Sequence, residues 1–241
     1  MITSRESRIG ILNENINICN DKNLKPEFRG GLVFGPTHVS CAESFIREDG
    51  DEYDRSRVIF EQTDTITSAL KYRRKTGVDF LVFASSRHYG GGVWNGSKAQ
   101  EEDIFLCTDL CMDHNNAQEK FYPLNGCMAM DCHIIRDSNF EVLEYPADAR
   151  AFFCPAPNLN LTNSGYDLWT RMCTFSDTTF DYVKGECLVI GAWGCGVFKN
   201  NPEEVADMFR KSMSMFLEDY RNVVVSIPDE NMLNIFKKKL S

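Results

Sequence analysis

Two adjacent carboxylates near the start of a predicted helix are the residues of this sequence best suited to chemistry. Glu101 and Glu102 follow Gln100 in a helix that we expect to span residues 97–111. Adjacent helical positions point about 100° apart, so one carboxylate can face a sheet while the other faces a groove beside it. A carboxylate beside a bound sugar can hold ribose hydroxyls or protonate a glycosidic oxygen. Taken alone, the pair is more typical of acidic residues that complement the helix dipole; its place beside a possible diphosphate site favours chemistry.

Two glycine-rich segments each follow a predicted buried strand. Gly90, Gly91 and Gly92 come after a strand at 78–84, and the segment 191–198 comes after a strand at 187–190. Ligands of open α/β sheets bind beyond the carboxyl ends of the strands, where glycine lets backbone N–H groups approach phosphate oxygens. The two segments could therefore hold one diphosphate between them, the alternative being two tight turns.

The glycine segments lack the fingerprints of the common nucleotide sites. Neither contains a Gly-x-Gly-x-x-Gly motif that opens a helix, and neither contains Gly-Lys-Ser or Gly-Lys-Thr. A Rossmann dehydrogenase and a P-loop ATPase are therefore disfavoured. The absence of a lysine in these segments suggests a diphosphate that is held rather than cleaved.

Strands and helices alternate along the chain. This alternation can place the glycine segments and the glutamates at one edge of a sheet. Apolar runs predict strands, and 3.6-residue periodicity predicts helices. The expected strands are 57–60, 78–84, 152–154, 187–190 and 222–226, and the expected helices are 64–74, 97–111, 202–220 and 229–239. Residues 112–150 alternate only weakly and indicate neither type. The pattern is typical of an α/β fold with a mainly parallel or mixed sheet between helices.

Length and composition favour one domain and exclude several classes of partner. The chain has 241 residues, 43% of them hydrophobic and 25% charged, without a Pro-, Gly- or Ser-rich linker. We therefore expect a single domain over 1–241, with 1–56 as a helical extension packed on it. The net charge of −9 argues against general nucleic-acid binding.

The apolar runs and the first residues indicate where the protein resides. The runs fall far short of the roughly 20 residues of a membrane span. The first residues carry charges of both signs without an apolar core behind them, unlike a secretory signal. We expect a cytoplasmic protein without a membrane partner, and a monomer.

The ten cysteines do not have the spacing of a metal site or of a disulfide framework. The nearest approach to a metal cluster is Cys107, Cys111 and His114, which would share one helix face. Because free cysteine is among the most buried residue types, we interpret them as structural thiols. No bound metal and no cofactor are expected.

The glycine and glutamate motifs together resemble those of a known family. Gly90-Gly91-Gly92, seven residues and then Gln100-Glu101-Glu102 resemble the signature of poly(ADP-ribose) glycohydrolases, and the segment 191–198 resembles their second loop, Gly-x-Trp-Gly-Cys-Gly-x-Phe. Segments 83–85, 154–158 and 201–206 are similar to the compact, bacterial-type branch. The resemblance implies a macrodomain, a three-layer α/β/α fold with a mixed, mainly parallel sheet and an ADP-ribose cleft at its crest.

The resemblance also implies roles for individual residues. Glu102 matches the catalytic glutamate, Glu101 its neighbour that bonds ribose hydroxyls, and Gln100 a supporting residue of the substrate site. The other residues implied to contact substrate are Gly90, Gly91, Gly92, Gly194, Cys195, Gly196, Val197 and Phe198. The implied activity is release of ADP-ribose from poly(ADP-ribose) or from related ADP-ribosylated macromolecules, without a metal. The motifs do not identify the residue that stacks on adenine.

One departure from the family pattern concerns the stretch before the triple glycine. The family usually has an asparagine there, often as Asn-Pro, whereas this chain reads Ser85-Ser86-Arg87-His88-Tyr89. Ser85, Ser86 or His88 could supply the hydrogen bond to the scissile ribose. The alternatives are a macrodomain that binds ADP-ribose without cleaving it and a hydrolase of another ADP-ribosyl compound. Tyr89 and Trp94 could line the cleft or pack in the core.

Overall fold

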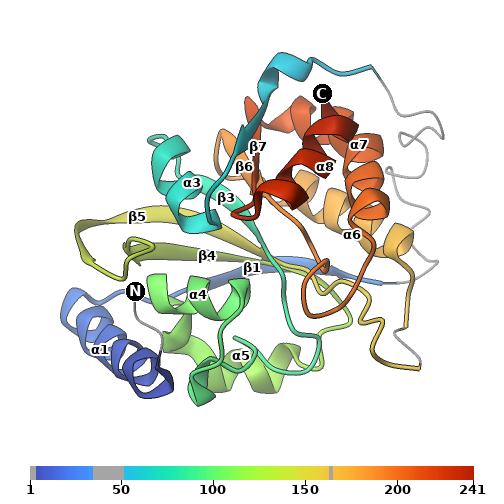
Figure 1. Ribbon diagram of the computed structural model, residues 1–241. Coiled ribbons are helices and arrows are strands. Elements are labelled where there is room, and N and C mark those ends of the chain that lie inside the picture. The colour runs from blue at the N-terminus through green and yellow to red at the C-terminus, as the bar shows by residue number, and fades with distance from the viewer. Residues whose placement is uncertain (1–3, 35–51, 163–164) are drawn as a thin grey trace.

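A seven-stranded sheet runs through the part of the chain that the computed structural model describes, residues 4–34, 52–162 and 165–241 (Figure 1). Its order is β1-β4-β5-β3-β6-β7-β2. The strands are β1 Glu27–Val33, β2 Val58–Glu61, β3 Val78–Val82, β4 Gly126–Arg136, β5 Val142–Phe153, β6 Cys187–Ile190 and β7 Asn222–Ser226. Strands β5, β3, β6, β7 and β2 pair in parallel, whereas β4 pairs antiparallel with both β1 and β5. The mixed, mainly parallel sheet is thus confirmed.

Helices cover both faces of this sheet. Helices α1 (Arg5–Lys22), α3 (Thr65–Tyr72), α4 (Gln100–Cys107) and α5 (His114–Phe121) lie on one face, and α6 (Leu168–Asp181), α7 (Pro202–Asp219) and α8 (Glu230–Leu240) lie on the other (Figure 1). Short 3₁₀ turns at Arg55–Arg57 (η1), Val93–Asn95 (η2) and Asp109–Asp113 (η3) connect them. The expected α/β/α layering is therefore confirmed.

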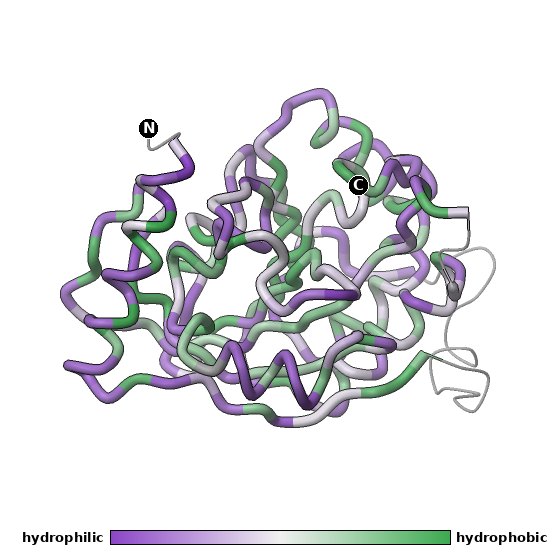
Figure 2. Tube along the Cα trace, turned by 90° about the horizontal axis from the view of Figure 1, so that it is seen from below, coloured by the Kyte–Doolittle hydropathy of each residue, from purple (hydrophilic) through white to green (hydrophobic). Residues whose placement is uncertain are grey.

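The central strand β3 shows why the sheet needs two helical layers. All five of its residues are buried. Phe80 and Val82 belong to the core beneath α1, α3 and α4, while Leu81 belongs to the core beneath α6, α7 and α8. Successive side chains of a strand point to opposite faces, so a continuous apolar run requires cover on both. In Figure 2, hydrophobic stretches run through the middle of the molecule, while the helical coils around it alternate between hydrophobic and hydrophilic residues.

The single helix expected over 97–111 is wrong. Helix α4 ends at Cys107, because Thr108 is extended and forms an isolated bridge with Ile134 of β4. The Thr108 hydroxyl donates to the Ile104 carbonyl at 2.8 Å and so satisfies an acceptor in the last turn. Cys107 and Cys111 are both buried in the core, but they do not share one helix face with His114.

Several elements were absent from the sequence-based expectation. The weakly patterned stretch 112–150 contains α5 and most of the antiparallel pair β4 and β5, and α6 was also not expected. The segment 1–56, expected to be helical, contains the strand β1 as well as α1 in its described part. Gly30 and Gly31 in the middle of β1 interrupt the alternation of apolar and polar residues that marks a strand. No helix within the described ranges is long and apolar enough to cross a membrane.

Candidate active site

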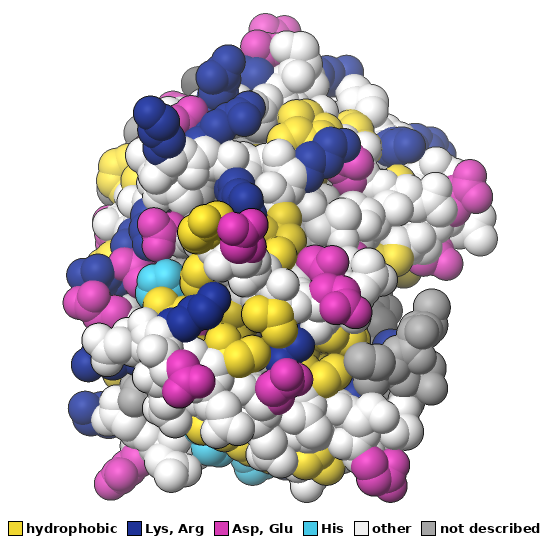
Figure 3. Space-filling model, turned by 90° about the vertical axis from the view of Figure 1, so that its left-hand side faces the viewer, with side chains coloured by type: hydrophobic (Ala, Val, Ile, Leu, Met, Phe, Trp, Pro, Cys, Tyr) yellow, Lys and Arg dark blue, Asp and Glu magenta, His cyan; other side chains and the backbone are white. Residues whose placement is uncertain are grey.

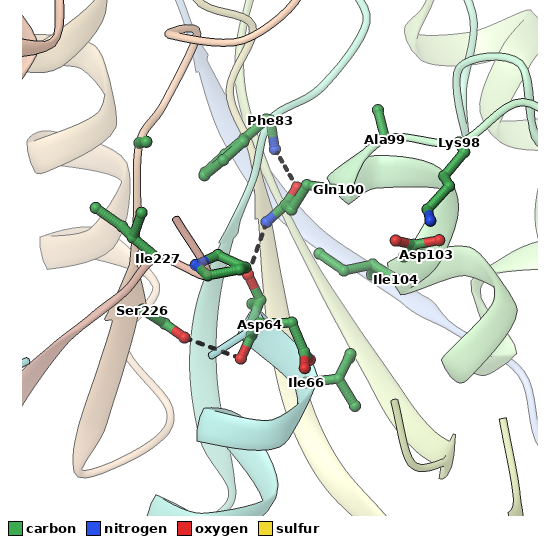
Figure 4. A pocket seen from close by; sticks show the side chains of 13 residues that line it. Asp64, Ile66, Phe83, Lys98, Ala99, Gln100, Asp103, Ile104, Ser226 and Ile227 are labelled. Carbon is green, nitrogen blue, oxygen red and sulfur yellow. Dashed lines mark hydrogen bonds between the residues drawn. The ribbon is translucent and has the colours of Figure 1, made fainter. Parts of the chain in front are cut away.

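The start of α4 is tied to the end of β3 by the side chain of Gln100. Its Oε1 accepts a hydrogen bond from the Phe83 backbone N–H at 2.9 Å (Figure 4), and its Nε2 donates to the Leu81 carbonyl at 2.8 Å. Nε2 also donates to Thr65 Oγ1 at 3.1 Å, at the start of α3. Gln100 therefore fixes the position of the next two residues, Glu101 and Glu102, relative to the end of β3.

Glu101 is enclosed by the loop that follows β3. Its Oε2 accepts from the Ser85 N–H at 2.7 Å and its Oε1 from the Gly90 N–H at 3.1 Å, and 4% of the residue is exposed. Burial raises the pKa of Glu101 to about 8; the two backbone N–H groups oppose this rise, and the neighbouring Glu102 adds to it. Glu101 is therefore largely protonated at neutral pH.

Glu102 combines one bonded and one free carboxylate oxygen. Its Oε1 accepts from the Gly92 N–H at 2.8 Å, while its Oε2 is buried without a hydrogen-bond partner among the described residues. Leaving a buried polar atom unpaired costs free energy, so such an atom marks a place where a ligand group can bind. The free oxygen is the most reactive feature of the site.

The triple-glycine turn lies directly against both glutamates. Gly91 has a φ of +57°, and a Cβ there would lie 2.6 Å from Glu102 Oε1 and 2.9 Å from Glu101 Oε2. Gly90 has a φ of +78°, and its Cβ would lie 2.7 Å from the ring of Phe105. Glycine is therefore required here by both conformation and space.

The stretch that departs from the family pattern folds back on itself. Ser85 Oγ accepts from the backbone N–H groups of Arg87 at 3.1 Å and His88 at 3.2 Å. The Ser86 carbonyl accepts from Leu124 N–H at 2.8 Å, while His88 is exposed. Ser85 thus stabilises the loop and keeps its hydroxyl proton available to a ligand.

The two aromatic residues flanking the glycines have different roles. Tyr89 is fully buried and packs edge-on against Phe105, with ring centroids 4.9 Å apart, so it belongs to the core. Trp94 is partly buried, and its indole Nε1 donates to His114 Nδ1 at 2.9 Å.

The second glycine segment leaves β6, the neighbour of β3, at the same edge of the sheet. Trp193 is fully buried and donates to the Cys154 carbonyl at 2.8 Å. Gly194 has a φ of +71°, and Asn200 Nδ2 donates to both the Gly194 carbonyl at 3.1 Å and the Pro157 carbonyl at 2.7 Å. These contacts anchor the base of the loop to the segment 154–158.

The tip of the second segment is open. Gly196 and Val197 are exposed, and nothing lies within 4 Å of a Cβ built on Gly196. Phe198 is partly buried against the core beneath α7, and its carbonyl accepts from Leu159 N–H at 3.0 Å. The backbone at Gly196 is therefore open to a ligand at this edge of the sheet.

Cys195 is expected to be dispensable for ligand binding. Burial raises the pKa of its thiol to about 12, so the sulfur is uncharged at neutral pH, and Sγ lies 3.6 Å from the Trp193 carbonyl. A Cys195→Ala protein should keep its affinity for ADP-ribose, the ligand that the sequence motifs imply, within about tenfold, since one hydrogen bond contributes about 0.5–1.5 kcal/mol. Isothermal titration calorimetry would check this; loss of binding by a folded variant would instead assign the thiol a chemical role.

Most of the described cysteines are buried. Of the nine within the described ranges, eight are buried and Cys195 is partly exposed, while Cys41 lies outside those ranges. In the same ranges, groups of three or more side chains able to hold a metal ion do not occur.

A cavity of about 320 Å³ opens at the carboxyl edge of the sheet, with Gln100, the residue before the two glutamates, in its wall. It lies between the N-termini of α3 and α4 and the ends of β3 and β7 (Figure 4). Its walls include Asp64, Thr65, Ile66, Phe83, Gln100, Ala192, Ser226 and Ile227. Asp64, Thr65, Ser226 and Ile227 belong to none of the sequence motifs, although the rule that ligands bind beyond strand ends applies equally to β2 and β7.

Protonation of Glu101 gives the site a testable pH dependence. Since its pKa is raised above the unfolded value, its neutral form stabilises the fold at low pH, and this contribution is lost as the pH rises through about 8. Glu101→Gln cannot ionise, so its melting temperature relative to the parent should rise between pH 6 and pH 9. Equal pH dependence of the two proteins in thermal melts would contradict the assignment.

Comparison with known proteins agrees with this geometry. The family model described as the microbial-type PARG catalytic domain matches residues 15–138, which include the triple glycine and both glutamates. A search of curated proteins returns no match. Among solved structures, poly(ADP-ribose) glycohydrolase (PARG) from Thermomonospora curvata is 22% identical, with a TM-score of 0.69 over 97% of this chain and 99% of that chain.

A second organism provides a similar fold. PARG from Deinococcus radiodurans in complex with ADP-ribose is 24% identical, with a TM-score of 0.71 over 88% of this chain and 94% of that chain. The fold is therefore shared along nearly the whole length, and the family model accounts for just over half of the chain. The chain belongs to the microbial-type poly(ADP-ribose) glycohydrolase family.

Proposed function

We propose that this protein hydrolyses the glycosidic bond that links a terminal ADP-ribose to poly(ADP-ribose) or to a related acceptor. The observation that carries the proposal is the free, buried Oε2 of Glu102 beside a glycine turn. The adjacent Glu101 and the open second glycine loop supply the remaining contacts that an ADP-ribosyl group requires.

The geometry suggests how such a ligand would lie. Backbone N–H groups around Gly196 are accessible to phosphate oxygens, so the second loop would hold the diphosphate. The distal ribose would then lie against Glu101 and Glu102, with Phe198 at its edge. The adenosine end would enter the 320 Å³ cavity, whose walls include Ala192 of the same loop and Gln100 beside the glutamates.

The reaction uses Glu102 twice. In protonated form its free oxygen donates a proton to the leaving oxygen as the bond to the anomeric carbon breaks, and an oxocarbenium-like state forms near the negative diphosphate. The resulting carboxylate then takes a proton from a water molecule that adds to the anomeric carbon. Glu101 holds the ribose hydroxyls, while the Gly92 N–H keeps Glu102 oriented.

The site and the surface together indicate which ligands and substrates this protein would bind. ADP-ribose and poly(ADP-ribose) would be the ligands, and ADP-ribosylated macromolecules the substrates. On the face shown in Figure 3, acidic and basic side chains are interspersed around a hollow with hydrophobic side chains. With a net charge of −9, this distribution favours recognition of the ADP-ribosyl group over general attraction to a nucleic-acid backbone.

The test compares three substrates. Labelled poly(ADP-ribose), mono-ADP-ribosylated protein and ADP-ribosylated DNA are each incubated with the protein, and free ADP-ribose is measured by chromatography. Release from the polymer supports the proposal, and the other two substrates show which acceptors are accepted. No release from any of the three would reject hydrolysis.

A second candidate function is binding of ADP-ribose without cleavage. The stretch 85–89 favours it, because it has no asparagine and Ser85 Oγ already accepts two backbone hydrogen bonds. ADP-ribose at 100 times its Kd would then stabilise the protein by about 2.7 kcal/mol in a thermal melt, without turnover. Replacing Ser85 and Ser86 by Asn in turn would test whether the missing amide accounts for a loss of activity.

A further inference from the structure

One face of α5 contacts the backbone before the triple glycine and the side chain of Trp94 after it. His114 and Gln118 are four residues apart, so their side chains lie on the same face of the helix. Gln118 Oε1 accepts from the Tyr89 N–H at 2.8 Å, and its Nε2 donates to the Arg87 carbonyl at 3.2 Å. Gln118 thus holds the chain immediately before Gly90.

His114 holds the other end of the same turn. Its Nδ1 accepts from the indole Nε1 of Trp94 at 2.9 Å, two residues after Gly92. The ring also packs against Tyr89, with ring centroids 6.2 Å apart, and its contact with the Tyr89 backbone acts to raise the pKa of His114. A neutral imidazole has one acceptor and one donor nitrogen, so a single tautomer satisfies both contacts.

The turn held in this way orients the catalytic glutamates. The Gly90 N–H donates to Glu101 and the Gly92 N–H donates to Glu102. The Val93 N–H in turn donates to the Gly90 carbonyl at 3.1 Å, which makes the segment from Tyr89 to Trp94 one hydrogen-bonded unit. A shift of Trp94 or Tyr89 would therefore move the donors that hold both carboxylates.

We propose that His114 is a positioning residue for the proposed hydrolysis: its neutral ring holds Tyr89 and Trp94 together across the triple glycine and thereby keeps Glu102 in place. The inference rests on the proposed function for its effect on turnover, but its structural part does not. His114 has no direct role in the chemistry.

Protonation should release this contact. An imidazolium has N–H groups at both nitrogens, so the Trp94 indole would lose its acceptor. Burial lowers the pKa of His114, the Tyr89 backbone opposes this shift, and the nearby His88 adds to it. A cavity of about 470 Å³, whose walls include Ile16, Trp94, Cys111 and His114, opens beside the ring, and Cys111 is the other titratable side chain there. Turnover should therefore fall at a pH below 6.5, the ordinary imidazole value.

Three variants test the proposal through kcat and KM. His114→Phe removes the acceptor, and kcat should fall by up to about 100-fold with little change in KM, as expected for misplaced catalytic groups. His114→Asn places an oxygen near the position of Nδ1, so its kcat should be close to that of the parent. Asparagine does not titrate in this range, so the part of the fall in kcat below pH 6.5 that His114 causes should be absent. Asn115→Ala, an exposed position beside the same cavity, is the matched control and should behave as the parent.

Tryptophan fluorescence provides a readout that does not depend on hydrolysis. An imidazolium quenches a neighbouring indole, so the difference in emission between the parent and Trp94→Phe should decrease as the pH falls below 6.5. The decrease should be absent in His114→Asn. The proposal would be overturned if the emission difference did not depend on pH, or if His114→Asn gave the same fluorescence titration. It would also be overturned if kcat and its fall at low pH were unchanged in His114→Phe.

Failure of the proposed function would be recognised separately. If the parent releases ADP-ribose from none of the three substrates, hydrolysis is rejected, and the fluorescence titration alone then tests the contact between His114 and Trp94. A pH-dependent emission difference that is absent in His114→Asn would support the positioning of Trp94 by His114. An emission difference that does not change with pH would overturn it.

Discussion

Replacement of Glu102 by Gln is expected to lower turnover of poly(ADP-ribose) by roughly 10²- to 10⁴-fold, the usual contribution of general acid–base catalysis. The amide oxygen can still accept from the Gly92 N–H, which now donates at 2.8 Å, so the side chain should stay in place. The amide cannot pass a proton to the leaving oxygen. ADP-ribose binding should therefore remain near the parental level while release of ADP-ribose nearly stops.

The measurement pairs single-turnover kinetics with calorimetric binding of ADP-ribose. Glu119→Gln makes the same chemical change at an exposed position on α5 and should leave both values unchanged. Turnover by Glu102→Gln equal to that of the parent would remove Glu102 from the chemistry. A parent that binds ADP-ribose and cleaves nothing would favour the binding function instead.

Substitution of Gly91 by Ala should be nearly as damaging, for a steric reason. A left-handed backbone costs a residue with a Cβ about 1–2 kcal/mol. The added Cβ would also lie 2.6 Å from Glu102 Oε1 and 2.9 Å from Glu101 Oε2, so at least one carboxylate must move. We expect a loss of stability of about 1–2 kcal/mol and a loss of turnover of the order of 100-fold, as for other misplaced catalytic groups.

Gly196→Val is the contrasting variant on the second loop. A Cβ at Gly196 meets nothing within 4 Å, so thermal stability should remain within about 0.5 kcal/mol of the parent. Its affinity for ADP-ribose should fall, because the side chain would occupy the space that phosphate oxygens need. Parental turnover by Gly91→Ala would show that the turn does not position the glutamates, and parental affinity of Gly196→Val would remove the diphosphate from this loop.

The sequence by itself determined the features that depend on short stretches of chain. The apolar runs of β3, β6 and β7 and the periodicity of α3 and α7 were enough to predict an α/β fold. The two glycine segments and the pair Glu101 and Glu102 were identifiable because their types and spacing resemble the motifs of a known family and follow predicted strand ends. Such features are local, so the residues that specify them are close in the sequence.

Only the tertiary structure decided the features that depend on contacts between distant segments. Helix α4 stops at Cys107 because Thr108 meets Ile134 of β4, and no local signal marks that bridge. Strand β1, with two glycines, is held by its pairing with β4 rather than by its own propensity.

The same holds within the candidate site. The free oxygen of Glu102, the burial of Tyr89 and the contact between Trp94 and His114 arise when α4, α5 and the loop after β3 pack together. Spacing along the chain predicts which residues can reach the carboxyl edge of the sheet. Which atoms there are paired and which are left free for a ligand is decided by long-range packing, because each buried polar atom must find its partner in another element.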